Sequence, residues 1–300
     1  MPALLLVRLP DILSPAKKLL QIKYKHSYIK LQHSVALFII KPINLNMSLP
    51  KKIALVTGGS RGLGKDMAIS IAKKGIDVVL TYRTNQADAE QTVKSIEALG
   101  QKSVALQLDM SDFSALDNFV QQVASTLQSS WNTDHFDFLI NNAGMGATVP
   151  FEKVTEELFT GFLNVHFKGI YFLTQKLVPM INEGGRIINI SSGTTRYANP
   201  GYSLYASMKG AIETFTKYLA KELGAKGIGA NVVAPGPVET DFNNGAIRNN
   251  PQMKGMLSAM SPFGRVGAAD DIGSVVAFLC TEDAKWINGQ RIEVSGGINV

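Results

Sequence analysis

A tyrosine and a lysine four residues apart, Tyr205 and Lys209, have the side chains needed to move a proton to or from a carbonyl group. They lie in segment 202–226, whose apolar periodicity predicts a helix, so both side chains share one helix face. A cation beside a phenol favours the phenolate, which brings the phenol pKa from about 10 towards neutrality. The pair is therefore a candidate acid and base for carbonyl–alcohol chemistry. The same spacing also arises by chance in solvated or structural pairs.

A glycine-rich segment, 57–64, lies between an apolar β-branched run at 52–57 and a helical pattern at 65–74. Glycines let a backbone turn tightly, and the free N–H groups at a helix start attract phosphate. This segment is therefore a candidate site for the pyrophosphate of a dinucleotide. Its candidate binding residues are Gly58, Ser60, Arg61, Gly62, Leu63 and Gly64.

The end of the second strand, predicted at 77–81, indicates which dinucleotide binds. It continues as Tyr82-Arg83, with no carboxylate to bind the 2′-hydroxyl of NAD. Arg61 in the glycine segment supplies a second cation, and guanidinium groups match phosphate geometry. The sequence favours NADP(H) over NAD. The alternative is that both arginines are merely exposed.

The alternation of strands and helices continues through the chain, which predicts an α/β fold with a parallel sheet covered on both faces. Further strands are expected at 102–108, 136–140, 185–190, 228–234 and 291–294. Further helices are expected at 86–99, 112–127 and 270–280, and one or two helices within 151–182. Polar or small residues follow several strands, at the edge where such sheets bind ligands. These candidate cofactor contacts are Asp109, Met110, Asn142, Ala143 and Gly144.

A serine, Ser192, follows the fifth predicted strand and lies 13 residues before Tyr205. Its hydroxyl is suited to hydrogen-bond a substrate carbonyl beside the tyrosine, or alternatively to close a turn. The sixth strand ends at Pro235 and Gly236. Segment 241–260 has no clean period, which favours a mobile lid over core.

The net charge of +6 lies entirely in the first 46 residues, which carry seven Lys or Arg side chains and one acidic side chain. Residues 47–300 carry 23 of each sign and are neutral, so no nucleic-acid or membrane partner is predicted. We expect residues 1–46 to be a basic, disordered or non-native extension, and residues 47–300 to form one catalytic domain. The single cysteine indicates a cytoplasmic protein, and no metal site is predicted.

These motifs together resemble the short-chain dehydrogenase/reductase family, and in particular its 3-oxoacyl-[acyl-carrier-protein] reductase-like members. The matching residues are the glycine segment 57–64, segment 141–144, Ser192, Tyr205 with Lys209, and Pro235 with Gly236. The resemblance implies a Rossmann-type, doubly wound, single-domain sheet of about seven parallel strands. It also implies a homotetramer, or a dimer, built on helices within 162–182 and 202–226.

The resemblance further assigns roles to individual residues. Ser192 would polarise the carbonyl, Tyr205 would act as general acid, and Lys209 would bind the nicotinamide ribose and lower the tyrosine's pKa. Val238 and Thr240, beside Pro235 and Gly236, would hold the carboxamide.

One position departs from the family pattern. Matching segment 169–174 puts His166 where relatives carry an asparagine, whereas Asn164 lies about 200° away around a helix. His166 would hold a water that relays protons, or would only cap or pack.

The function expected from these residues is NADP(H)-dependent reduction of a ketone or of a 3-oxoacyl thioester. Two alternatives remain open: an NADP-linked alcohol or sugar dehydrogenase working oxidatively, and an NADP(H)-binding sensor or scaffold without turnover.

Overall fold

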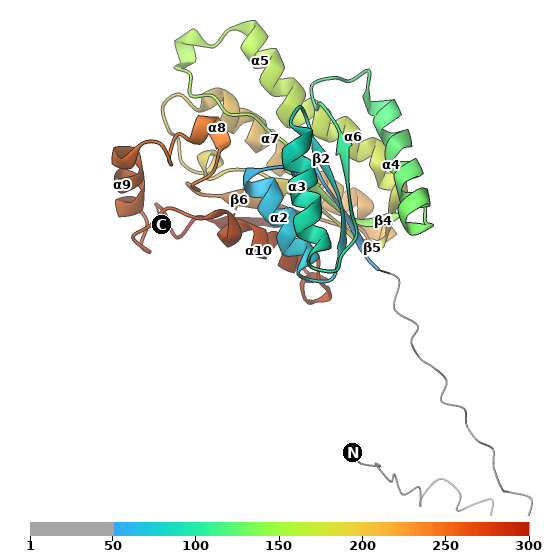
Figure 1. The fold of residues 1–300 in the computed structure, drawn as a ribbon. Coiled ribbons are helices and arrows are strands. Elements are labelled where there is room, and N and C mark those ends of the chain that lie inside the picture. The colour runs from blue at the N-terminus through green and yellow to red at the C-terminus, as the bar shows by residue number, and fades with distance from the viewer. Residues whose placement is uncertain (1–50, 300) are drawn as a thin grey trace, which may run out of the picture. The chain divides into compact units, whose positions relative to one another are not determined.

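Short apolar strands alternate with helices along the computed structural model, which describes residues 51–299 (Figure 1). The basic extension predicted for residues 1–46 lies outside the described residues. No helix within residues 51–299 is both long enough and apolar enough to cross a membrane.

Seven parallel strands form one sheet in the order β3-β2-β1-β4-β5-β6-β7. The strands are β1 Ile53–Val56, β2 Asp77–Tyr82, β3 Ser103–Gln107, β4 Phe136–Asn141, β5 Ile181–Ile190, β6 Gly229–Pro235 and β7 Arg291–Val294. The order reverses between β1 and β4, which is where open α/β sheets bind ligands at their carboxyl edge. The predicted Rossmann-type sheet is confirmed.

Helices cover both faces of this sheet. One face carries α2 Gly62–Ala72, α3 Gln86–Glu97 and α10 Ala269–Leu279, and the other carries α4 Leu116–Trp131, α6 Gly169–Leu177 and α7 Ser203–Leu223. Helix α5, Glu156–Leu163, precedes α6. Helix α10 packs along α2 although more than 190 residues separate them in the chain.

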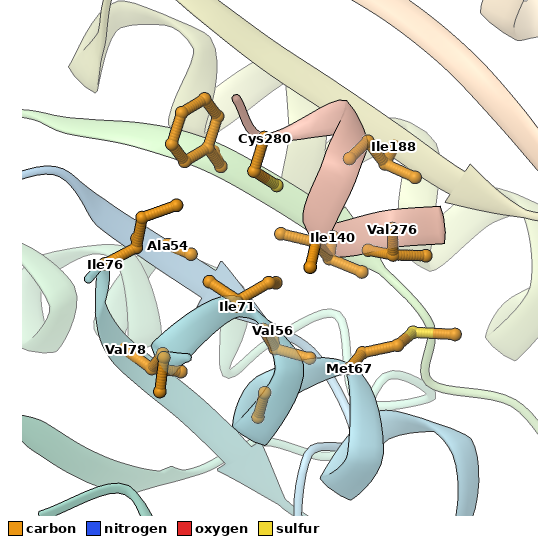
Figure 2. Packing of buried hydrophobic residues seen from close by; sticks show 14 of the residues in the cluster. Ala54, Val56, Met67, Ile71, Ile76, Val78, Ile140, Ile188, Val276 and Cys280 are labelled. Carbon is orange, nitrogen blue, oxygen red and sulfur yellow. The ribbon is translucent and has the colours of Figure 1, made fainter. Parts of the chain in front are cut away.

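The core between the sheet and α2 with α10 is built from apolar residues of the strands and of both helices. Val56, Val78 and Ile140 from three strands meet Ile71 of α2 and Val276 of α10, as Figure 2 shows. All five are fully buried. This packing fixes the start of α2, and with it the glycine segment, against the sheet.

Segment 241–260 differs from the sequence-based expectation of an irregular lid, because it forms α8 Phe242–Gly245 and α9 Pro251–Met260. Asn250 caps α9 by accepting a hydrogen bond from the Met253 backbone, and Pro251 occupies the first helical position. An asparagine before a proline is a helix-start signal, which outweighs the lack of a clean apolar period.

Helix α4 is also displaced by four residues from its predicted start. The carboxylate of Asp112 accepts hydrogen bonds from the backbones of Ser114 and Ala115, so it closes a turn ahead of the helix. The helix then continues to Trp131, whose indole donates to the buried Asp77.

Candidate active site

Three side chains meet where β5 ends and α7 begins. Tyr205 lies in the first turn of α7 and Lys209 one turn later, while Ser192 follows β5. The Ser192 hydroxyl lies near enough to the Tyr205 phenol to lower the pKa of that phenol, and the Lys209 ammonium lies 5.6 Å from the centre of the tyrosine ring. The structure therefore brings together all three predicted catalytic residues.

The Ser192 hydroxyl keeps its proton free to donate because its lone pairs are already used. Ser192 Oγ accepts from the Thr194 backbone at 3.2 Å and from the Thr194 hydroxyl at 3.0 Å. A hydroxyl has one donor and two acceptor positions, so its single proton is left for an acceptor in the site. Thr194 was not predicted as a site residue, and only its place two residues after Ser192 would have indicated it.

Lys209 is buried, at 3% exposure, and donates to the carbonyl oxygen of Ile190 at 2.7 Å. Burial lowers its pKa to about 8. The expectation that Lys209 lowers the tyrosine's pKa stays a prediction. Burial raises the pKa of Tyr205, and Ser192 only partly opposes that rise. Loss of water around the phenolate, which destabilises the charged form, is the largest cause.

The glycine segment forms a cradle beside β1. Gly58 has a φ of +66°, which favours glycine, and a Cβ at Gly64 would overlap the carbonyl oxygen of Gly58. Gly58 N–H donates to the Thr81 hydroxyl at 3.0 Å, which fixes the turn against β2. Only bare backbone fits here, as a pyrophosphate site requires.

The remaining predicted residues of this segment surround the start of α2. Arg61 is the N-cap residue and Gly62 begins the helix, while Leu63 packs against the core and Ser60 accepts through its carbonyl from Thr92. A Cβ at Gly62 would lie 3.8 Å from Thr240, which places the loop after β6 across from the glycine segment.

Two arginines stand exposed at this edge of the sheet. Arg61 precedes α2 and Arg83 follows β2, and neither guanidinium pairs with a carboxylate of residues 51–299. The end of β2 carries no acidic side chain. These residues fit a dinucleotide with a phosphate on its adenosine ribose.

A buried threonine joins the glycine segment to the loop after β4. The Thr57 hydroxyl accepts from the backbones of Asn142 and Ala143, both at 3.0 Å, and donates to Ile140. The side-chain amide of Asn142 in turn donates hydrogen bonds to the carbonyl oxygens of Thr57 and Gly58. Thr57 was not predicted as a site residue. A threonine between a buried strand and a glycine turn is the signal that would have found it.

Asp109 and Met110 follow β3, but their side chains serve local structure. The Asp109 carboxylate accepts from the backbone and the hydroxyl of Ser111 at 2.9 and 2.7 Å. Met110 is 4% exposed and packs in the core near Gly169. The structure therefore gives no free Met110 side chain to a cofactor.

The loop after β6 is held by the last strand and by the segment before α10. Gly236 donates to Val294 at 2.9 Å, and Val238 pairs with Gly267 in an isolated bridge. Pro235 ends β6 and is buried, while Thr240 accepts from the Phe242 backbone. The four predicted residues of this loop thus line the same edge as the glycine segment.

His166 is fully buried in a π-helical turn, Asn164–Lys168, and its ring lies edge-on to Tyr205 at 5.3 Å. Its Nε2 lies 2.7 Å from the carbonyl oxygen of Met145, so we assign the proton to Nε2. Burial first, and then the Lys209 charge, lower the pKa of His166 to about 3. His166 is therefore neutral at pH 7 and holds the loop after β4 in place.

Replacing His166 separates the two roles left open by its sequence. We expect His166→Ala to lower kcat about tenfold, because the loop beside Tyr205 loses its anchor. His166→Asn retains a donor for Met145 and should recover most of that loss. Rescue of His166→Ala by added imidazole would indicate a proton relay instead. Unchanged turnover in His166→Ala would contradict both roles. Steady-state kinetics with NADPH measure each outcome.

An aromatic side chain that the sequence did not single out closes the site. The ring of Phe242 in α8 lies 6.1 Å from the ring of Tyr205, and a Cβ at Gly146 would lie 2.7 Å from it. The lid helix thus covers the loop after β4.

Comparisons with known proteins agree with this arrangement. Residues 58–299 match the family model described as enoyl-(acyl carrier protein) reductase. An uncharacterized oxidoreductase of Methylorubrum extorquens is 37% identical over 250 residues, covering 83% of this chain and 98% of its own. A hydroxynaphthalene reductase-like protein of Metarhizium robertsii is 36% identical over 261 residues, covering 83% and 96%. Among solved structures, the angucycline C-6 ketoreductase LanV with bound NADP is 36% identical in sequence and superposes with a TM-score of 0.79. This match covers 82% of the present chain and 95% of the LanV chain.

This chain belongs to the short-chain dehydrogenase/reductase family. The predicted family and the predicted oxidoreductase class are confirmed.

Proposed function

We propose that this protein reduces a ketone to a secondary alcohol with NADPH, and that Tyr205 is the proton donor. The observation that carries the proposal is the convergence of Ser192, Tyr205 and Lys209 at the carboxyl end of β5. The glycine cradle and the exposed pair Arg61 and Arg83 fit NADP(H), which LanV binds.

Each residue of the site has a distinct task. NADPH, when bound, supplies the hydride that reduces the carbonyl carbon. Ser192 is placed to donate a hydrogen bond to the carbonyl oxygen, and Tyr205 gives that oxygen its proton. Lys209 holds positive charge beside the phenol while the proton leaves, which stabilises the developing phenolate. The glycine segment and the loop at 235–240 orient the cofactor.

The protonation state of the site fits Tyr205 as the proton donor in ketone reduction. The raised pKa of Tyr205 keeps the phenol protonated at neutral pH, as a proton donor requires. Lys209, with a pKa near 8, is charged below that pH. The same residues would serve the oxidative reaction, so the direction depends on the cofactor ratio and the substrate.

The lid favours an uncharged ring ketone over a carrier-bound 3-oxoacyl thioester. Its two basic side chains are both neutralised, Arg248 by Asp241 and Lys254 by Glu239, each at 2.6 Å. Phosphopantetheine and acidic carrier proteins bind best to unpaired cations. Phe242 and Tyr202, whose ring lies 6.4 Å from that of Tyr205, instead offer aromatic surface.

A substrate panel tests this proposal through loss of NADPH absorbance. We expect bicyclic aromatic ketones to have kcat/KM at least about tenfold above an acetoacetyl thioester, with β-ketoesters, diketones and quinones as further members. Phe242→Ala should remove most of that preference by raising KM for the ring ketones. The control is Phe151→Ala, because Phe151 is 80% exposed and is not among the described aromatic residues whose rings contact Tyr205.

The other candidate functions give different results in the same assay. Preference for the thioester would favour the 3-oxoacyl substrate, and turnover only with NADP⁺ and alcohols would favour the oxidative dehydrogenase. Tight NADPH binding without turnover of any substrate would favour the sensor.

The homotetramer expected from the family resemblance remains a proposal. Tyr171 and Phe172 on α6 are 38% and 39% exposed, and their rings lie 5.4 Å apart. Aromatic side chains gathered on a helix surface are typical of subunit interfaces. This supports the predicted use of α6 and α7 for assembly.

A further inference from the structure

A cluster of charged side chains lies directly beside the turn that carries Ser192. This cluster, Glu213, Arg291, Glu293 and Arg196, joins helix α7, strand β7 and the short helix at Gly193–Thr195. The side chains of Glu213, Arg291 and Glu293 are 17%, 22% and 14% exposed, so these three are largely screened from water, whereas Arg196 is 52% exposed at the edge of the cluster. Two acids and two bases make it electrically neutral.

Glu213 extends the catalytic face of α7 by one more turn. Tyr205, Lys209 and Glu213 are spaced by four residues, so they share one side of the helix. All three face the chain segment around Ser192. Tyr205 lies beside the Ser192 hydroxyl, Lys209 donates to the Ile190 carbonyl, and Glu213 accepts from the hydroxyls of Ser191 and Thr195, both at 2.7 Å.

Arg291 of β7 completes this connection from the other side. Its Nε donates to Glu213 at 2.8 Å, and its Nη2 donates to the carbonyl oxygen of Ser192 at 3.3 Å and to the Thr195 hydroxyl at 3.1 Å. One guanidinium therefore contacts the backbone of the catalytic serine as well as the helix of the catalytic tyrosine. Its planar fork fixes these distances more rigidly than a lysine would.

Glu293 holds Arg291 in this orientation. Its carboxylate accepts from Arg291 Nη1 at 3.0 Å, from Arg196 at 3.1 Å and from the Ser295 hydroxyl at 2.9 Å. In strand β7, the carbonyl oxygen of Val294 also accepts a hydrogen bond from the backbone N–H of Gly236. The same strand therefore positions the loop after β6. The serine turn and that loop thus share one support.

We propose that the Glu213–Arg291 ion pair is a positioning device for ketone reduction: it locks the Ser192 turn against α7, so that the serine hydroxyl and the tyrosine phenol keep their positions relative to each other. Neither side chain touches the reacting atoms, so both are positioning residues. The inference rests on the proposed reductase function. A displacement of about 1 Å at a reacting centre costs on the order of 10²-fold in rate, which gives such a lock a measurable value.

The test is Glu213→Leu, which keeps the side-chain bulk and removes every acceptor. We expect kcat for the best ketone of the panel to fall about 30-fold, while the NADPH Kd, measured by fluorescence, stays within about threefold. Glu213→Gln, which retains an acceptor oxygen for Ser191 and Thr195, should lose only about threefold. A purely structural role would lower Tm and the active fraction without this separation of kcat from cofactor binding.

A double-mutant cycle shows whether Glu213 acts through the serine. In a Ser192→Ala background, Glu213→Leu should lower kcat by no more than about twofold further, because the group it positions is gone. Lys176→Met is the matched control: it breaks the ion pair between Lys176 of α6 and Asp117 of α4, and should leave kcat unchanged.

Arg291→Met tests the same pair from β7 if Glu213→Leu does not fold, and the same loss of kcat is expected. Full kcat in a folded Glu213→Leu or Arg291→Met protein would overturn the positioning role. An equal loss in the wild-type and Ser192→Ala backgrounds would also overturn it. Absence of ketone turnover by the wild-type protein would instead refute the proposed function, so the two failures are distinguishable.

Discussion

Tyr205→Phe is expected to lower kcat for ketone reduction about 10³-fold, within the range that general acid catalysis contributes. The substitution removes only the phenol oxygen. The ring keeps its packing against His166 at 5.3 Å and Phe242 at 6.1 Å, so the fold and the lid should be retained. NADPH binding should change by less than about threefold, because the glycine segment is untouched. Stopped-flow NADPH oxidation and a fluorescence titration measure the two quantities.

Tyr218→Phe is the matched control for this substitution. Tyr218 lies on the same helix, more than three turns after Tyr205, and is 63% exposed, so kcat should be unchanged. Retention of more than about a tenth of the activity in Tyr205→Phe would contradict Tyr205 as the proton donor. Ser192 would then be the next candidate, since its hydroxyl already faces the phenol.

Arg83→Asp should convert the preference for NADPH into one for NADH. A hydrogen bond to a charged group contributes about 1.5–3 kcal/mol, so its loss weakens NADPH binding by roughly ten- to 10²-fold. The introduced carboxylate adds repulsion of the 2′-phosphate and supplies an acceptor for the 2′-hydroxyl of NADH. The NADH Kd should therefore fall or stay constant. Titration of both cofactors by fluorescence measures the ratio.

Lys74→Asp controls for the change in net charge. Lys74 is exposed just past the C-terminal end of α2, far along the helix from the glycine segment, and should leave the cofactor ratio unaltered. If Arg83→Asp weakened the binding of NADPH and of NADH equally, Arg83 would not be the residue that recognises the 2′-phosphate. Arg61, exposed at the start of α2, would then carry the selectivity.

The sequence by itself determined the order of the seven strands along the chain and the residue types of the site. Three features of the site are local sequence patterns: the glycine segment at 57–64, the absence of an acidic residue at the end of β2, and the spacing of Tyr205 from Lys209. They could therefore be identified without coordinates. The family followed from the same patterns, and the comparisons confirm it. The cytoplasmic location and the extension at 1–46 stay predictions.

Tertiary structure alone decided the electrostatics of the site and its support. Burial raises the pKa of Tyr205 against the expected effect of Lys209, and it keeps His166 neutral. Glu213 and Arg291 meet across 78 residues of chain, and no local period relates them. Periodicity records which face of an element is apolar, whereas desolvation and long-range ion pairs depend on which elements pack together. Those properties exist only once the sheet has formed.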